Sequence, residues 1–228
     1  MNDKQLVAIE AAKLVQSGML VGLGTGSTAN YFIEELARRR QQEGLNITTV
    51  ASSTISAQKA QSLQLPIVAL EHISHIDLYV DGADEITPNL TLLKGRGSDL
   101  VKEKLLSKAA TQFIVVADES KLVKHIGQNF LIPIEVIPFA WQLAKRNLEL
   151  IGGIGDLRPN AAKDGFWITS HGSYVLDMRF ENQYEAEAST LSAAISNTPG
   201  VVEHGIFDRL TSSVLIAANG NITEMHRQ

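Results

Sequence analysis

The chain has 228 residues, 44% of them hydrophobic, which suits one large domain or a medium domain that carries a small one. Its formal net charge of −5, from 20 basic and 25 acidic residues, disfavours a nonspecific nucleic-acid binder, because such proteins usually carry a basic excess. The chain has no cysteine, which excludes disulfides, thiolate nucleophiles and cysteine-ligated metal centres.

The N-terminal residues enter an amphipathic stretch directly, without the apolar segment of a signal peptide. No run of the sequence approaches the roughly 18 apolar residues that a membrane span needs. Together with the lack of cysteine, these features predict a cytoplasmic protein with no membrane partner and no nucleic-acid partner.

Apolar runs alternate with helical patterns through the first 125 residues, as expected of βαβ units around a mostly parallel sheet. The predicted strands cover residues 19–22, 48–51, 67–69, 76–80 and 113–117, and the predicted helices cover residues 4–16, 27–40, 53–63 and 98–110. Ser53 is a suitable N-cap for the third helix, since its hydroxyl can accept a hydrogen bond from a first-turn N–H.

The pattern changes after Gly127. A strand bounded by prolines at 132–138 is followed by a helix at 139–150, a hairpin at 165–178, a helix at 184–196 and a closing strand at 201–203. This order predicts a small α+β domain at 129–204. Residues 1–128 and 205–228 are expected to form the α/β domain, with a strand at 213–218 that returns to the first sheet.

A glycine-rich turn, Gly22-Leu23-Gly24-Thr25-Gly26-Ser27-Thr28, lies between the first predicted strand and the second predicted helix. The backbone N–H groups of such a turn can hold an anion. Its spacing matches neither the dinucleotide fingerprint nor the P-loop, and no acid follows the second strand to bind a ribose. A tight turn without a ligand is the alternative, but three hydroxyl side chains favour phosphate binding.

Two segments concentrate charged side chains. Asp81-Gly82-Ala83-Asp84-Glu85 follows the strand predicted at 76–80, and Lys94-Gly95-Arg96-Gly97 precedes the helix predicted at 98–110. Open α/β sheets bind ligands at such strand ends. Closely packed carboxylates raise one another's pKa, which suits proton transfer, and a lysine can stabilise developing negative charge. Acids that only form turns or cap a helix are the alternative interpretation.

Glu103 lies on the helix predicted at 98–110, and Leu100 and Leu106 share its face. These apolar neighbours would partly bury the carboxyl and raise its pKa, as suits a general base near neutral pH. The same periodicity places Lys102 among apolar neighbours, so the pattern alone does not select Glu103.

Three other side chains give weaker signals. His72 and His75 are too few for a closed metal site, and a solvated loop is expected there. Lys121 follows the strand predicted at 113–117 and can reach the same sheet edge, although a plain surface lysine is the alternative.

The chain resembles type A ribose-5-phosphate isomerases in motifs that span most of its length in the family's order. They are Gly24-Thr25-Gly26-Ser27-Thr28, Ser52-Ser53, Tyr79-Val80-Asp81-Gly82-Ala83-Asp84-Glu85, Lys94-Gly95-Arg96-Gly97, Glu103-Lys104, Asp118-Glu119-Ser120-Lys121 and Pro133-Ile134-Glu135-Val136. Asp-Gly-Ala-Asp-Glu followed by Lys-Gly-x-Gly is highly specific. The resemblance implies a Rossmann-like first domain and a smaller, ferredoxin-like second domain.

The resemblance implies reversible interconversion of D-ribose 5-phosphate and D-ribulose 5-phosphate through a cis-enediolate, without a metal or another cofactor. This aldose–ketose isomerisation belongs to the non-oxidative pentose phosphate pathway. Glu103 would be the base, and Asp81, Asp84 and Lys94 would be the other catalytic residues. The implied substrate-binding residues are Thr25, Gly26, Ser27, Thr28, Asp81, Gly82, Ala83, Asp84, Lys94, Gly95, Arg96, Gly97, Lys121 and Lys4. The implied assembly is a homodimer or a dimer-based tetramer.

Three segments depart from the family pattern. Arg96 replaces a glycine, Leu131 replaces a proline, and residues 169–173 read Thr-Ser-His-Gly-Ser where Thr-Asp-x-Gly-Asn is usual. Arg96 costs stability if its position needs a positive φ, and otherwise adds a cation beside the sugar. Two other functions stay open: a sugar-phosphate sensor, which would need no base, and a CoA transferase, which would form a thioester on its glutamate.

Overall fold

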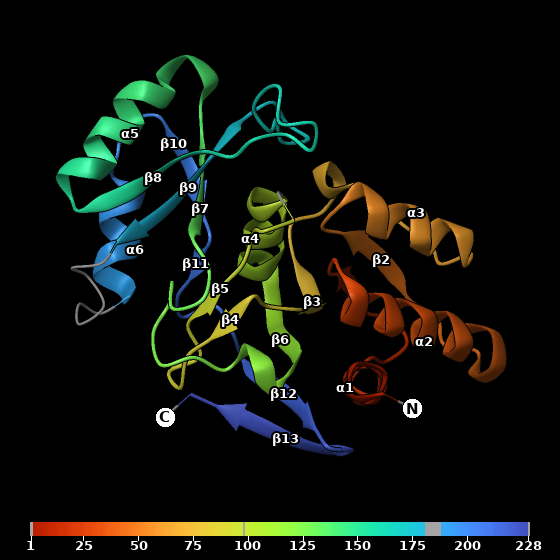
Figure 1. Cartoon of the computed structure of the whole chain (residues 1–228). Coiled ribbons are helices and arrows are strands. Elements are labelled where there is room, and N and C mark those ends of the chain that lie inside the picture. The colour runs from red at the N-terminus through yellow and green to blue at the C-terminus, as the bar shows by residue number, and fades with distance from the viewer. Residues whose placement is uncertain (1, 98, 181–187, 228) are drawn as a thin grey trace. The chain divides into compact units, whose positions relative to one another are not determined.

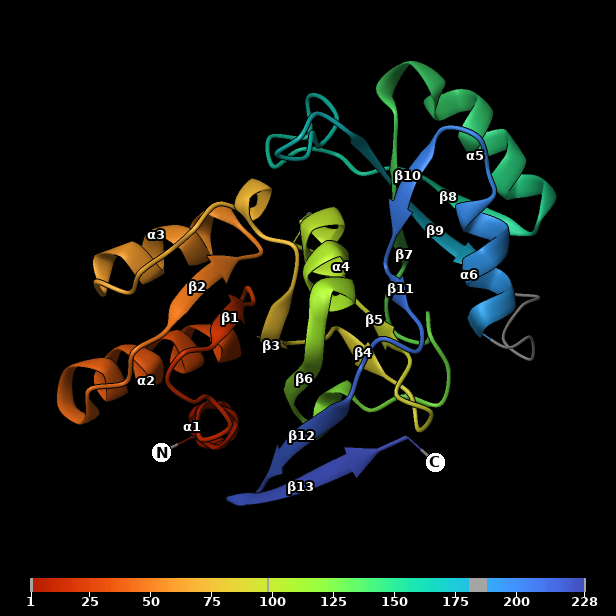
Figure 2. The same ribbon diagram turned by 180° about the vertical axis from the view of Figure 1, so that it is seen from behind.

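The structure, a computed structural model, describes residues 2–97, 99–180 and 188–227. The chain forms two compact units (Figures 1 and 2): unit 1 consists of Met1–Ala83, Lys102–Lys121 and Arg209–Gln228, and unit 2 consists of Asp84–Val101 and Leu122–Asp208. This division differs from the predicted domains, 1–128 with 205–228 and 129–204, because the segments 84–101, 122–128 and 205–208 belong to unit 2. The domain boundaries themselves stay a prediction.

Unit 1 is built on a six-stranded sheet in the order β13-β12-β6-β3-β1-β2. Its strands are β1 (Leu20–Leu23), β2 (Thr48–Ala51), β3 (Ile76–Asp81), β6 (Ala110–Asp118), β12 (Ser213–Ala218) and β13 (Asn221–His226). All neighbouring strands are parallel except β12 and β13, so the predicted mostly parallel α/β sheet is confirmed. Parallel strands end at one edge of the sheet, and the segments that follow β1, β2, β3 and β6 therefore lie along this edge.

The helices that lie within unit 1 are α1 (Asp3–Ala12), α2 (Ser27–Glu43) and α3 (Thr54–Ser62), with the short 3₁₀ helices η1 (Leu70–His72) and η2 (Glu119–Lys121). Of these, α1 and α3 have side-chain N-caps. Ser53 is the N-cap of α3, as predicted, and its Oγ accepts from the Ser56 N–H at 3.1 Å. The helix α4 (Leu100–Ala109) begins in unit 2 and continues into unit 1, and its predicted start at Ser98 lies outside the described residues.

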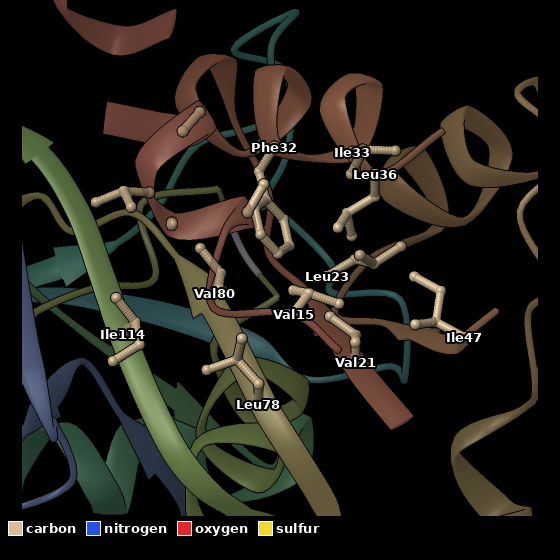
Figure 3. Packing of buried hydrophobic residues seen from close by; sticks show 14 of the residues in the cluster. Val15, Val21, Leu23, Phe32, Ile33, Leu36, Ile47, Leu78, Val80 and Ile114 are labelled. Atoms are coloured by element: carbon tan, nitrogen blue, oxygen red, sulfur yellow. The ribbon is translucent and has the colours of Figure 1, made fainter. Parts of the chain in front are cut away.

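The core of unit 1 lies between α1, α2 and the sheet. Figure 3 shows Phe32, Ile33 and Leu36 of α2 directed toward strand residues such as Leu23 and Val80. All five side chains are fully buried. Burial of a large aliphatic or aromatic side chain stabilises a fold by about 1.5–3 kcal/mol, so this contact holds β1, β3 and α2 together. The loop between β1 and α2 is thereby fixed at both ends.

Unit 2 contains a four-stranded antiparallel sheet in the order β10-β7-β9-β8. Its elements are β7 (Ile132–Val136), α5 (Trp141–Leu150), β8 (Gly153–Leu157), β9 (Tyr174–Phe180), α6 (Ala188–Ser196) and β10 (Val201–His204). This β-α-β-β-α-β order is the ferredoxin-like arrangement that the resemblance implied. Both helices lie on the same side of the sheet (Figures 1 and 2). The first part of the helix predicted at 184–196 lies outside the described residues.

A second, three-stranded sheet of unit 2 has the order β11-β5-β4. Its strands are β4 (Glu85–Ile86), β5 (Leu92–Leu93) and β11 (Ile206–Phe207), and the 3₁₀ helix η3 (Pro138–Ala140) precedes α5. The antiparallel pairing of β5 with β4 and with β11 is the reason why the segment after Ala83 belongs to unit 2.

Two predicted strands are wrong. Ile67 forms only an isolated bridge to Thr49, and the segment 165–169 forms isolated bridges at Phe166 and Ile168. Within the described part of the chain, no helix combines the length and apolar character needed to cross a membrane.

Candidate functional site

The glycine-rich loop leaves β1 and passes close to the end of β3. The Gly24 N–H donates to the Val80 carbonyl at 2.9 Å. A Cβ on Gly24 would lie 2.2 Å from Asp81 Oδ1 and 2.6 Å from Asp81 Cα. Only glycine permits this approach of the two backbones, so the residue type at position 24 sets the distance between the loop and the carboxylate.

Thr25 ties the loop to the segment after β2. Its Oγ1 lies 2.9 Å from Ser52 Oγ, 2.8 Å from Ser53 Oγ and 3.2 Å from Ser56 Oγ. Ser56 Oγ also donates to the Gly24 carbonyl at 2.6 Å. This hydroxyl cluster engages the Thr25 side chain within the protein. The Thr25 hydroxyl therefore anchors the loop, a use for the Ser52-Ser53 pair that sequence reasoning missed, and substrate binding by Thr25 stays a prediction.

The N-terminus of α2 presents free donors next to this anchor. Gly26 is the N-cap, with φ of 108°, and among the described residues no side chain caps the helix. Gly26 and Ser27 are exposed, and Thr28 is half-buried. The first N–H groups of a helix have no intrahelical acceptor and carry a positive partial charge. This end of α2 can therefore bind an anion.

The two lysines implied by the resemblance lie near this end of unit 1. Lys4 Nζ donates to Ser27 Oγ at 3.2 Å. Partial burial raises the pKa of Asp118, but hydrogen bonds from Ser120 and the charges of Lys121 and Lys4 outweigh it, so the net pKa is lowered. Both ammonium groups thus act on one carboxylate at the end of β6, the neighbour of β3 in the sheet.

Asp81 is the last residue of β3 and is fully buried. Its Oδ1 accepts from the Thr25 N–H at 3.0 Å and from the Gly82 N–H at 2.8 Å. Its Oδ2 accepts from the Tyr79 hydroxyl. These three donors hold the Asp81 carboxylate against the glycine-rich loop. Tyr79 was missed at the sequence level, although its position two residues before Asp81 on a strand places both side chains on one face.

Tyr79 also connects Asp81 with Glu103. Burial raises the pKa of Tyr79 well above its usual value, and the negative charges of Asp81 and Glu103 raise it further. Glu103 itself is 5% exposed. Tyr79 stacks on Phe113, with ring centroids 4.9 Å apart, so its hydroxyl is held in place. In unit 1, therefore, one buried carboxylate is bonded to the Tyr79 hydroxyl and the charge of a second acts on the same tyrosine, at the sheet edge that carries an anion-binding helix end.

The second charged segment belongs to unit 2. Lys94 is 4% exposed, its N–H donates to the Gly205 carbonyl at 2.9 Å, and its ammonium lies 5.8 Å from the centroid of the Phe207 ring. The Asp84 N–H donates to the Leu93 carbonyl at 2.8 Å. Ala83 and Asp84 are half-buried, and Gly97 is exposed. Lys94 and Asp84 are thus placed by the small sheet.

Arg96 does not occupy a left-handed position. In this loop the residue with a positive φ, 96°, is Gly95. Arg96 itself does not have a positive φ. Arg96 therefore does not carry the backbone strain that a positive φ would have imposed on it. Its guanidinium lies 3.9 Å from the centroid of the Phe130 ring, and its N–H donates to Asp84 Oδ2 at 3.4 Å. The side chain also lines a cavity of about 360 Å³ in unit 2.

The third acid of the Asp-Gly-Ala-Asp-Glu segment has a different role from the first two. Glu85 is fully buried in unit 2. Its carboxylate accepts from the backbone N–H groups of Gly127 at 2.6 Å, Asn129 at 2.6 Å and Phe130 at 3.0 Å. Glu85 therefore holds the segment that precedes β7. Sequence reasoning had grouped it with the acids that move protons.

The remaining candidates give no site. His72 and His75 are exposed, as expected for a solvated segment before β3. In the part of the chain that the structure describes, no group of three or more His, Asp or Glu side chains is placed to hold a metal ion.

The sequence is similar to a characterised family over most of its length. The model of ribose 5-phosphate isomerase A (phosphoriboisomerase A) matches residues 48–221. The ribose-5-phosphate isomerase A of Thermosynechococcus vestitus is 42% identical over 214 residues, which cover 93% of this chain and 90% of that protein. The Methanosarcina acetivorans protein of the same name is 42% identical over 226 residues, which cover 99% and 95%.

Solved structures give the same relationship. The ribose 5-phosphate isomerase A of Methanocaldococcus jannaschii has a TM-score of 0.92 at 39% identity and covers 98% of both chains. A D-ribose-5-phosphate isomerase in complex with phospho-erythronic acid has a TM-score of 0.94 at 36% identity and covers 100% of both chains. This chain belongs to the ribose 5-phosphate isomerase A family.

Proposed function

We propose that this chain is an aldose–ketose isomerase that interconverts D-ribose 5-phosphate and D-ribulose 5-phosphate. The observation that carries the proposal is the buried Asp81 carboxylate bonded to the Tyr79 hydroxyl, with the charge of Glu103 acting on the same tyrosine, at the sheet edge that also carries an uncapped helix N-terminus. Proton transfer on a phosphorylated sugar needs both parts, a buried carboxylate and an anion site. Family membership supports the same activity.

The substrate phosphate is proposed to bind at the N-terminus of α2. Gly26, Ser27 and Thr28 would supply backbone and hydroxyl donors, and Lys4, which donates to Ser27 Oγ at 3.2 Å, would supply positive charge. Lys121 is the second cation, because it acts with Lys4 on Asp118. A helix terminus and two ammonium groups together suit a dianionic ligand.

Glu103 is proposed to transfer the proton between the two carbons. It would take the proton from C2 of the open-chain aldose and return it to C1, so one carboxylate serves both directions. Its almost complete burial supports this role, because a buried carboxylate is a stronger base than a hydrated one. Lys94, which is also buried, would stabilise the negative charge of the cis-enediolate.

The two aspartates are proposed to divide the remaining tasks. Asp81 accepts from Thr25, Gly82 and Tyr79, and this suits an anion that holds the loop and the sugar in place. Asp84 is half-buried, which leaves its carboxyl more accessible for a proton. We therefore assign ring opening and transfer of the hydroxyl proton to Asp84. Gly82, Ala83, Gly95 and Gly97 would line the sugar through their backbones.

The direct test is conversion of ribose 5-phosphate to ribulose 5-phosphate by the purified protein in buffer that contains EDTA. Turnover is expected, because the proposed reaction needs no metal or other cofactor. A folded protein that binds ribose 5-phosphate but gives no ribulose 5-phosphate would favour a sugar-phosphate sensor. Trapping of an acyl group by hydroxylamine, without isomerisation, would favour a CoA transferase.

The cellular compartment, the assembly and the partners of the protein are also proposed. We propose a cytoplasmic homodimer or dimer-based tetramer that acts on a small sugar phosphate, with no nucleic-acid or membrane partner. Sedimentation of the purified protein tests the assembly.

Arg96→Ala is expected to change kcat and KM less than tenfold and to lower Tm by a few degrees. The reason is that the guanidinium stacks on Phe130, a contact worth about 0.5–1 kcal/mol at an exposed site. Steady-state kinetics and thermal unfolding measure both quantities. Arg179→Ala, at another arginine that lines the same cavity, is the control. A loss in kcat/KM well above tenfold, about 1.4 kcal/mol, would instead mean that Arg96 contacts the substrate.

A further inference from the structure

Unit 2 contains a buried acid–histidine pair that the proposed reaction does not use. Glu135, the penultimate residue of β7, is fully buried, and its Oε2 lies 2.6 Å from Nε2 of His171. His171 is partly exposed on the turn before β9. Glu135 Oε1 is also buried, and among the described residues no group forms a well-aligned hydrogen bond with it. Burying a carboxylate in this way costs free energy, so the pair calls for an explanation beyond packing.

The pair faces the first turn of α4. Burial raises the pKa of Glu135, while His171, the Thr169 hydroxyl and the Val101 backbone N–H each favour the charged carboxylate. Val101 is the second residue of α4. The first N–H groups of a helix need acceptors and are stabilised by a nearby negative charge. The interaction with the Val101 N–H therefore links the charge of Glu135 to the N-terminus of α4 electrostatically.

A second link joins the turn that carries His171, residues 169–173, to the start of α4. Ser170 Oγ donates to Asp99 Oδ1 at 3.5 Å. The turn itself is closed by Thr169, whose Oγ1 accepts from the Ser173 N–H at 3.0 Å. Of the described charged residues, Glu203 is the neighbour of Glu135 on the adjacent strand β10, and Asp99 contacts Ser170 of the turn. The histidine turn and β7 together hold residues 99–101.

Glu103 follows Val101 by two residues on the same continuous helix. A shift of the first turn would therefore move its Cα and the direction of its side chain. We propose that Glu135 and His171 are positioning residues that fix the first turn of α4 and thereby the place of the base. The catalytic part of this inference rests on the proposed isomerase activity, whereas the structural part concerns α4 alone.

The test compares His171→Ala and His171→Gln with wild type. His171→Ala removes the donor to Glu135 and is expected to lower kcat about 10- to 100-fold with KM nearly unchanged, since small displacements of a reacting group have effects of this size. His171→Gln keeps an N–H donor and is expected to restore most of the rate. Hydrogen–deuterium exchange of a peptide that covers residues 99–106 is expected to be faster in His171→Ala and near wild type in His171→Gln.

Two controls make the outcome decisive. His226→Ala breaks the exposed pair in which His226 Nε2 lies 3.6 Å from Glu224 Oε1, and it should leave rate and exchange unchanged. Glu135→Gln, which changes the buried partner, should reproduce the exchange effect if it folds. Wild-type kcat and unchanged exchange in His171→Ala would overturn the inference. A fall in kcat and Tm together with a rise in KM would also overturn the inference, because these changes would indicate general destabilisation of the protein.

The exchange measurement separates this inference from the proposed function. If wild type shows no isomerisation, the proposed function fails, and faster exchange in His171→Ala still supports the role of the pair at α4. If wild type is active and both the rate and the exchange of His171→Ala are normal, the proposed function stands and the positioning role fails.

Discussion

Glu103→Gln is expected to lower kcat for ribose 5-phosphate isomerisation about 10²- to 10⁴-fold, which is the contribution typical of a positioned general base. The amide has nearly the same volume as the carboxyl but cannot take the proton from C2. Because the proposed phosphate site lies at α2, KM should change little. Initial rates in EDTA-containing buffer measure the effect. Incorporation of solvent deuterium into the sugar should fall in parallel, since the base exchanges its proton with water.

The matched control is Glu119→Gln, which makes the same change at an exposed glutamate of η2. It should retain turnover within about twofold, a difference well below 1 kcal/mol. Glu103 is buried, so thermal unfolding of Glu103→Gln must show a stable fold before the rate is interpreted. A folded variant that retains more than about a tenth of wild-type turnover would contradict the assignment of Glu103 as the base.

Hydrophobic periodicity predicted the main elements of unit 1. The strands at 48–51 and 213–218 agree with β2 and β12, and the cap at Ser53 agrees with α3. The hydrophobic pattern missed strands in which buried residues neither alternate with exposed ones nor form a continuous run. Gly153–Leu157 was missed because glycines and Asp156 interrupt its apolar residues, yet it pairs with β9 along its whole length. The edge strand β13 was missed because its residues are largely polar and exposed.

The candidate site was predictable where motif residues follow strand ends and unpredictable where a residue serves a distant contact. Thr25 was counted among the phosphate donors, but its hydroxyl contacts the serines after β2, 27 or more positions away in the sequence. Lys4 entered only through the resemblance, and its contact with Ser27 depends on the packing of α1 against α2. Such pairings arise from tertiary structure, which local patterns do not contain.

Glu85 is the clearest case of a motif residue with a structural role, and its substitution should affect stability more than chemistry. Glu85→Ala leaves the N–H groups of Gly127, Asn129 and Phe130 without their acceptor inside the protein. Buried donors that lose a partner cost about 1–3 kcal/mol each, and water can replace only part of this loss. We expect a loss of about 3 kcal/mol or more, a fall in Tm of about 6–12 °C for a chain of this size.

Glu85→Gln distinguishes loss of the charge from loss of the side chain. It keeps one oxygen acceptor but turns an amide NH₂ toward one of the backbone donors, so its destabilisation should lie between wild type and Glu85→Ala. Glu71→Ala, at an exposed glutamate of η1, is the control and should leave Tm unchanged. At temperatures far below its Tm, where the variant is folded, Glu85→Gln should retain kcat within about tenfold of wild type. A larger loss of kcat with an unchanged Tm would return Glu85 to the acids that move protons, and the three backbone hydrogen bonds would then serve to hold a catalytic group.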